Sequence, residues 1–126
     1  MERKAIPIGI DVYLRYEGME EAEQQAQYTG FSVAHGHVGY LREAYHGEPY
    51  ATHVLVPESF NDGEGPVAIP AATMRERLPA ALEACALRYN GEGSVKEMAQ
   101  RSLIEFVELA ERWESEGKAV YVLNSY

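Results

Sequence analysis

Apolar and polar residues alternate strictly near the start of the chain, in the stretch AIPIGIDVYLRY over residues 5–16. The even positions carry large apolar side chains, whereas the odd positions carry a mixed set that includes Asp11, Tyr13 and Arg15. Because side chains alternate between the two faces of a strand, the even set forms one apolar stripe. This stretch is predicted to be the first strand of a sheet that helices cover on one face.

A helical spacing replaces this alternation toward the C-terminus. Residues 95–116 place apolar side chains, among them Phe106 and Trp113, at steps of three and four, with charged side chains opposite. A capping-box pattern that starts at Ser94 precedes them. Residues 17–28 carry a thinner apolar stripe and four glutamates, which predicts a shorter helix with a solvated acidic face. The sequence therefore predicts a long helix and a short one.

The remaining helical pattern contains Pro79. A proline inside a helix removes one backbone hydrogen bond, and its ring clashes with the carbonyl of the preceding turn. Two helices are therefore predicted, over residues 70–77 and 79–89. Pro70 suits the first helical position, although a capping-box pattern at Thr73 would start the first helix three residues later.

Four further segments have the alternation or composition of strands, namely residues 31–35, 37–45, 50–57 and 118–126. The second of them also fits a helix, but we favour an extended piece that forms a hairpin with the segment before it. Three consecutive helices cannot all be crossovers between parallel strands. The chain is therefore predicted to be a single α+β domain over residues 1–126. Its expected architecture is one mixed or mainly antiparallel sheet of four to five strands, with helices packed on one face.

Charge and cysteine content narrow the classes of partner and the compartment. The chain carries 20 acidic and 11 basic residues, a formal net charge of −9, and no long basic run. Such a field repels phosphate backbones and anionic lipid, so we expect neither a nucleic acid nor a membrane as partner. We see no signal peptide and expect a cytoplasmic location. Cys85, the single cysteine, is expected to be an inert core thiol.

The four histidines lie between residues 35 and 53 of the chain. His35 and His37 are two positions apart, so an extended backbone would place both imidazoles on one side, where Asp11 could complete a metal site. The pattern alone is weakly specific, and Gly36 between the two histidines favours a bend. We therefore expect no cofactor, with a divalent metal ion as the alternative.

A second set of candidate binding residues overlaps the histidine segment. Arg42 offers a planar fork of donors that suits a carboxylate or a phosphate. Tyr40, Tyr45 and His46 lie near it in the sequence and complete a candidate anion or ligand site. The competing interpretation is structural, since arginine among tyrosines commonly stacks on their rings.

Ile104 is an apolar residue at an unexpected place in the long C-terminal helix. On a helical wheel it falls within the polar face of that helix, among glutamates and a glutamine. A single exposed isoleucine is common, but one ringed by charge also suits the centre of a protein interface. We therefore keep Ile104 as a candidate interface residue.

Two functions from different classes follow from these patterns. The leading hypothesis is a non-catalytic protein-binding or regulatory module that acts through a protein partner or through self-association. Its support is the lack of a recognisable catalytic motif in the sequence, together with nine tyrosines, a residue favoured at interfaces. The alternative is a small metal-dependent or anion-binding enzyme that uses residues 35–53, so whether the chain is an enzyme stays open.

Overall fold

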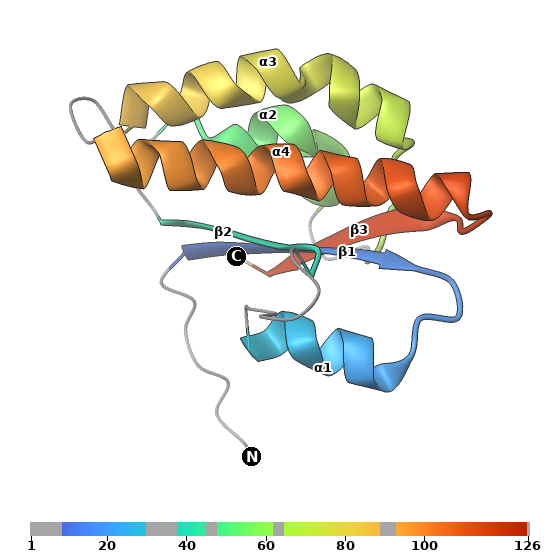
Figure 1. Ribbon diagram of the computed structural model, residues 1–126. Coiled ribbons are helices and arrows are strands. Elements are labelled where there is room, and N and C mark those ends of the chain that lie inside the picture. The colour runs from blue at the N-terminus through green and yellow to red at the C-terminus, as the bar shows by residue number, and fades with distance from the viewer. Residues whose placement is uncertain (1–8, 30–37, 45–47, 62–64, 89–92, 126) are drawn as a thin grey trace.

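A computed structural model describes residues 9–29, 38–44, 48–61, 65–88 and 93–125 of the chain (Figure 1). The elements in chain order are β1 (Gly9–Tyr16), α1 (Glu21–Thr29), β2 (Tyr40–Ala44), α2 (Ala51–Leu55), a 3₁₀ turn η1 (Pro57–Ser59), α3 (Ala71–Arg88), α4 (Gly93–Ser115) and β3 (Val120–Ser125).

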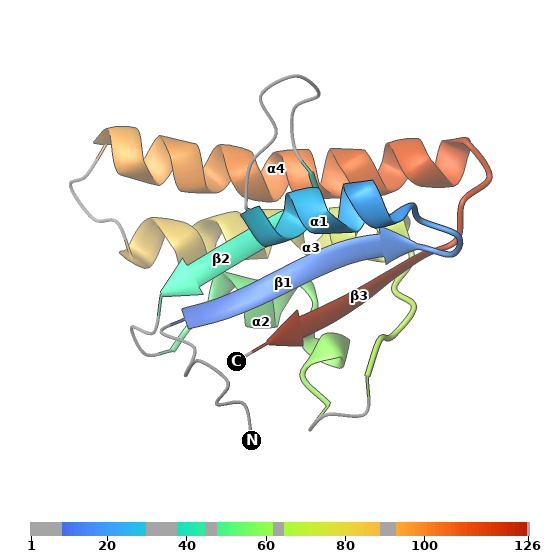
Figure 2. The same cartoon turned by 90° about the horizontal axis from the view of Figure 1, so that it is seen from below.

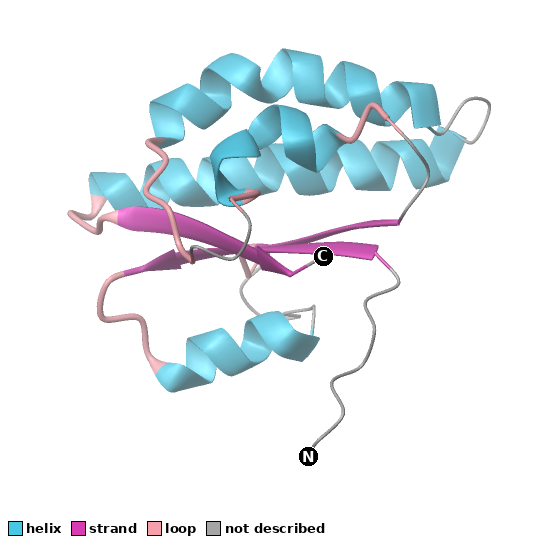
Figure 3. Cartoon of the chain, turned by 180° about the vertical axis from the view of Figure 1, so that it is seen from behind, coloured by secondary structure: helices cyan, strands magenta, loops and turns pink. Residues whose placement is uncertain are grey.

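The described strands form one antiparallel sheet in the order β2-β1-β3, so β1 lies in the middle. Helices α2, α3 and α4 cover one face of the sheet, and α1 lies on the other (Figures 1 and 3). The predicted α+β class with one antiparallel sheet is confirmed. Within the residues that the structure describes, the sheet has three strands rather than the four to five predicted, and α1 corrects the prediction that helices pack on one face alone.

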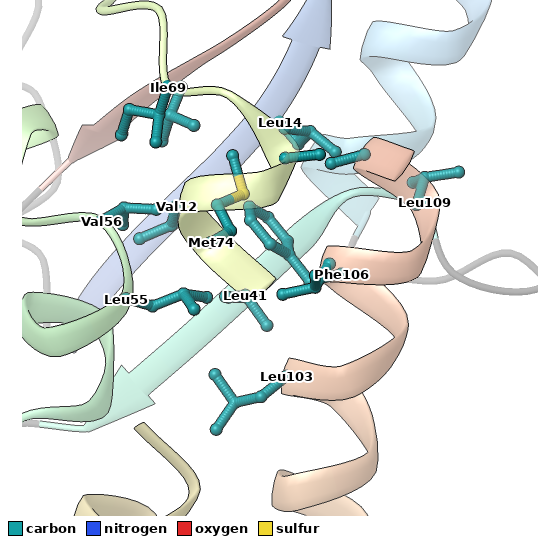
Figure 4. Packing of buried hydrophobic residues seen from close by; sticks show 14 of the residues in the cluster. Val12, Leu14, Leu41, Leu55, Val56, Ile69, Met74, Leu103, Phe106 and Leu109 are labelled. Carbon is teal, nitrogen blue, oxygen red and sulfur yellow. The ribbon is translucent and has the colours of Figure 1, made fainter. Parts of the chain in front are cut away.

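The apolar stripe of β1 forms the floor of the core, as its alternation predicted. Ile10, Val12 and Leu14 are fully or almost fully buried. Val12 and Leu14 lie on the side of Met74 of α3 and Phe106 of α4, with further apolar side chains from α2 and β2 around them (Figure 4). Burying side chains of this size is the main source of stability for such a layer.

Helix α4 confirms the prediction for residues 95–116 to within two residues at its start and one at its end. Phe106 and Trp113 are both buried, as the spacing predicted. The helix also fixes the start of α3, because the Glu114 carboxylate accepts a hydrogen bond of 2.9 Å from the backbone N–H of Ala71. An acceptor at this position satisfies a donor that the first turn of any helix leaves unpaired.

Helix α3 runs without a break through Pro79, so the predicted division into two helices is wrong. Buried positions continue at helical spacing across the proline, with Met74 and Leu78 before it and Ala81 and Cys85 after it. A proline in a helix interior costs about 3 kcal/mol. Helix α3 packs against α2 and α4, and this packing outweighs that cost here.

Residues 50–57 form helix α2 and the start of η1, so the predicted strand is wrong. The Glu43 carboxylate on β2 accepts hydrogen bonds from the backbone N–H groups of Ala51 and Thr52, at 2.8 and 2.9 Å, and from the Thr52 hydroxyl at 2.7 Å. Together with Leu55, these two residues form the buried side of the helix. A cap supplied by another element thus starts a helix in a segment whose own composition favours a strand.

The other three predicted strands and the short predicted helix have different outcomes. Residues 118–126 yield β3, which is confirmed, and residues 37–45 yield β2, which pairs with β1. The predicted strand 31–35, which was expected to form a hairpin with the β2 segment, lies outside the described residues. Residues 17–28 yield α1, which begins four residues later than predicted.

The structure also bears on the predictions for Cys85 and for membrane-spanning helices. Cys85 is buried, and this burial raises the pKa of its thiol, as expected for an inert core cysteine. In the described part of the chain, no helix combines the length and the hydropathy that a bilayer crossing requires.

Tyr16, at the end of β1, contacts both α1 and α4. Its hydroxyl also makes the free energy of unfolding depend on pH in the alkaline range. Its hydroxyl donates to Glu23 at 2.5 Å, and its ring packs edge-on against Trp113 with centroids 4.7 Å apart. The bond to Glu23, together with burial, raises the pKa of Tyr16 from 10.0 to about 12. The unfolded chain therefore loses the phenolic proton first, so stability falls as the pH rises from 10 to about 12.

We expect Tyr16→Phe to flatten this alkaline fall in the free energy of unfolding. The variant loses one hydrogen bond at neutral pH, and it also loses the group whose proton the folded state retains. Urea denaturation at a series of pH values measures the effect, with Tyr121→Phe on β3 as the matched control. Equal steepness of the fall in the wild type and in Tyr16→Phe would show that Tyr16 does not carry this pH dependence.

Candidate functional site

The face of the sheet opposite the main core carries a group of polar and aromatic side chains. Register places Asp11 opposite Arg42 and Tyr13 opposite Tyr40 on the paired strands β1 and β2. Residues directly opposite in an antiparallel pair share a face, so all four side chains lie on the side where α1 packs. Figure 2 looks at this side and shows α1 in front of the sheet.

Three tyrosines from three elements meet on this face, and we call Tyr13, Tyr28 and Tyr40 the tyrosine cluster. The Tyr13 ring stacks on Tyr40 with centroids 5.5 Å apart and meets Tyr28 edge-on at 5.6 Å. Tyr13 and Tyr40 are half-buried, whereas Tyr28 on α1 is 58% exposed. The cluster therefore exposes one tyrosine, Tyr28, on a base of two half-buried tyrosines.

Arg15 fixes the exposed tyrosine in place. Its guanidinium donates to the Tyr28 hydroxyl at 2.9 Å, to Gln24 Oε1 at 3.2 Å and to Gln27 Oε1 at 3.0 Å. The same group lies 5.5 Å from the Tyr13 ring centroid and 5.4 Å from that of Tyr28. Arg15 is buried, and all these partners are neutral, so hydrogen bonds and aromatic faces together compensate the buried charge.

Gln27 joins α1 to strand β1 and to the segment just before β2. It is fully buried, and its Nε2 donates to the backbone oxygens of Leu14 at 2.6 Å and Val38 at 2.9 Å. Gly39 leaves room for this amide, because a Cβ there would lie 2.9 Å from Gln27 Nε2 and 3.1 Å from the Leu14 oxygen. Its positive φ of 87° also favours glycine. The base of the tyrosine cluster is therefore rigid.

Asp11 binds Tyr40 and Arg42, the two predicted ligand residues that lie on β2. The Tyr40 hydroxyl donates to Asp11 Oδ1 at 2.7 Å, and Arg42 forms an ion pair with the same oxygen. Burial and this bond raise the pKa of Tyr40, while the Tyr40 hydroxyl and the Asp11 carboxylate raise the pKa of Arg42. Because Asp11 already engages the Arg42 guanidinium, an incoming anion would have to compete with an internal carboxylate.

The structure thus brings Tyr40, Arg42 and Asp11 together, although the last was predicted as a metal ligand rather than as their partner. The other members of the predicted anion and metal sites, Tyr45, His46, His35 and His37, lie outside the described residues. Among the residues that are described, no group of three or more His, Cys, Asp or Glu side chains is arranged to hold a metal ion. A divalent metal ion at these residues therefore stays an untested alternative.

His53 lies away from this face, on α2 at the other side of the sheet. Its ring packs between those of Tyr50 and Phe60, with centroids 5.0 and 4.2 Å away, and its Nδ1 lies 3.5 Å from a Glu48 carboxylate oxygen. This histidine is therefore an aromatic packing residue that does not join the tyrosine cluster.

Ile104 on α4 is partly buried and packs against the hydrophobic core. Its neighbours on the helix include Leu103, which is buried, and Glu105, which is half-buried. A role for Ile104 as an interface anchor stays a prediction, and it does not lie on the face that carries the tyrosine cluster.

Sequence reasoning missed Tyr13, Arg15, Gln27 and Tyr28 as members of a site. A signal for Tyr13 and Arg15 was present in the sequence, because both occupy odd positions of the alternating stretch over residues 5–16, opposite the apolar stripe. Two large aromatic or basic side chains at such positions need a cover of their own. Nothing local marked the two α1 residues, since their importance depends on how the helix packs.

The chain matches no protein-family model, no curated protein and no solved structure.

Proposed function

We propose that the chain is a non-catalytic protein-binding module whose contact surface is the tyrosine cluster together with the acidic side of α1. The observation that carries the proposal is Tyr28, which is 58% exposed while Arg15 fixes its hydroxyl. Tyrosine offers a large, stiff contact area with a polar tip, and it is enriched at interfaces. An exposed tyrosine anchored from below has the properties of an interface hot spot.

The rigid base of the cluster supports the same proposal. Binding costs free energy whenever it orders mobile side chains, about 0.5–1.5 kcal/mol for each one that it immobilises. Here Arg15 and Gln27 already order the exposed ring before any partner arrives. A partner would therefore meet a surface that is organised in advance.

The charge of α1 and of the whole chain indicates the chemistry of the partner. Glu17, Glu20, Glu21 and Glu23 are exposed on α1 and on the turn before it. The chain as a whole carries a net charge of −9. Negative potential attracts basic partners, and the faces of tyrosine rings attract ammonium and guanidinium groups. We therefore propose a protein segment rich in lysine or arginine as the partner.

The ionisable groups beside the cluster favour binding over chemistry. The Asp11 carboxylate accepts from Tyr40 and pairs with Arg42, and the Arg15 guanidinium is engaged by three side chains. Groups occupied by one another in this way support structure, whereas a general acid or base must reach a substrate proton. This consideration supports the non-catalytic form of the proposal.

An NMR titration of the full chain with a short lysine–glycine peptide tests the proposed function. We expect saturable amide shift changes centred on α1 and on the tyrosine cluster, and no binding of the matched glutamate–glycine peptide. Tyr28→Ala should weaken binding roughly tenfold, the effect of losing one anchor of about 1.4 kcal/mol.

Leu87→Ala is the matched control, because Leu87 is an exposed apolar residue of α3, on the other side of the sheet. Its affinity for the peptide should equal that of the wild type. Equal affinity for the two peptides, or shift changes that spread evenly over the acidic surface, would contradict the proposal.

A further inference from the structure

Strand β2 forms one edge of the sheet, and the direction of its backbone groups follows from one hydrogen bond. The backbone N–H of Leu14 donates to the carbonyl oxygen of Gly39 at 2.7 Å. Backbone groups alternate in direction along an antiparallel strand, so the odd-numbered residues of β2 bond to β1. The N–H and C=O groups of Tyr40, Arg42 and Ala44 therefore point outward, away from the sheet.

The two edges of the sheet differ in what lies against them. On the β3 edge, Val67 and Val122 exchange two backbone hydrogen bonds, of 2.9 and 2.8 Å, which close that edge at its middle. Along the outer edge of β2, none of the described segments pairs with the backbone. Such a row of outward donors and acceptors is a template for one more strand.

Features that normally protect an exposed edge are weak on β2. The strand holds no proline, and Ala44 at its end is exposed. Arg42 is the one basic residue of the strand, and its charge is already matched by Asp11. An unmatched lysine or arginine would discourage pairing, whereas this ion pair removes that penalty.

We propose that the partner of this module adds to the outer edge of β2 as an extended strand, with its basic side chains over the tyrosine cluster. This inference rests on the proposed function and specifies how the partner binds. Strand addition uses main-chain hydrogen bonds for affinity and alternate side chains for selectivity. One set of partner side chains would lie on the face of Tyr40 and Arg42, and the other on the face of Leu41.

The two faces of the edge predict the pattern of the partner sequence. The face of Tyr40 continues into the tyrosine cluster, whose aromatic rings suit basic side chains. The face of Leu41 belongs to the hydrophobic core, so it suits apolar side chains. The expected partner segment therefore alternates basic and apolar residues.

The position of α4 argues for a single strand rather than for a second copy of this chain. In Figure 2, α4 lies on the side of β2 away from β1, in the helical layer behind the sheet. A continuous sheet across two β2 edges would bring the two α4 helices together over the joint. One added strand needs only the usual spacing of about 4.8 Å beside β2.

Amide hydrogen exchange of the full chain, alone and with a short peptide of alternating lysine and valine, tests the inference. In the free protein, we expect slow exchange for the Leu41 amide and fast exchange for the amides of Arg42 and Ala44. Saturating peptide should slow the latter two by roughly tenfold or more, because each gains a strand hydrogen bond.

N-methylation of the peptide separates this inference from the proposed function. Two peptides are compared, each methylated on one of the two alternate sets of backbone nitrogens. Methylation of the set that faces β2 should abolish binding, and methylation of the set that faces away should leave binding unchanged. Binding that is lost in Tyr28→Ala but indifferent to both methylation patterns would overturn strand addition and leave the proposed surface standing. Slow exchange of Arg42 and Ala44 in the free protein would also overturn it, because the chain itself would then occupy the edge.

Discussion

Replacing Phe106 with alanine is expected to lower the free energy of unfolding by about 3–5 kcal/mol. Phe106 is fully buried and lies where the apolar face of β1 meets α3 and α4. The variant loses the transfer free energy of the ring and leaves a cavity that fixed neighbours such as Val12 and Met74 cannot fill. Urea denaturation followed by far-UV circular dichroism measures the loss.

Met98→Ala is the matched control for Phe106→Ala. Both residues lie on α4, but Met98 is 71% exposed. Its truncation should change the free energy of unfolding by no more than about 0.5 kcal/mol. Similar losses in the two variants would mean that the face of α4 described here is not the one that packs on the sheet.

Gln27→Leu is expected to cost about 2–4 kcal/mol and to release α1 from the sheet. The leucine matches the amide in size but cannot accept from Arg15 or donate to the backbone oxygens of Leu14 and Val38. These groups would then stay buried without their partner, which is more costly than a missing hydrogen bond at the surface. Urea denaturation measures the loss, and faster amide exchange in α1 shows where it occurs.

Gln25→Leu makes the same chemical change two residues away, at an exposed position of the same helix. It should leave the free energy of unfolding within about 0.5 kcal/mol of the wild-type value. A loss in Gln25→Leu as large as that in Gln27→Leu would indicate a general effect on helix α1 rather than the loss of its link to the strands.

The parts of the fold that the sequence predicted are those with a long pattern inside one element. The two-residue alternation of β1 and the spacing of Phe106 and Trp113 in α4 each identify both the element and its buried side. Their information is local, because each pattern repeats several times within one segment.

The parts that it did not predict depend on contacts between elements. Glu43 on β2 starts α2, and packing on both sides of Pro79 keeps α3 in one piece. Neither effect is visible in the segment itself, where composition favoured a strand and proline chemistry favoured a break.

The candidate site shows the same division. Tyr40 and Arg42 could be selected from the sequence because their residue types suit ligand binding. That Asp11 pairs with them follows from strand register, which the sequence does not display. The roles of Arg15 and Gln27 follow from the docking of α1 on the face of the sheet that was expected to lie open to solvent.

The most direct test of the account is a nuclear Overhauser measurement on the ring protons of the tyrosine cluster in the free protein. We predict cross-peaks from Tyr13 to both Tyr28 and Tyr40, together with slowed exchange of the Arg15 guanidinium protons. Rings without mutual cross-peaks, and an Arg15 side chain that exchanges as freely as one in water, would contradict a preorganised aromatic surface on this face of the sheet.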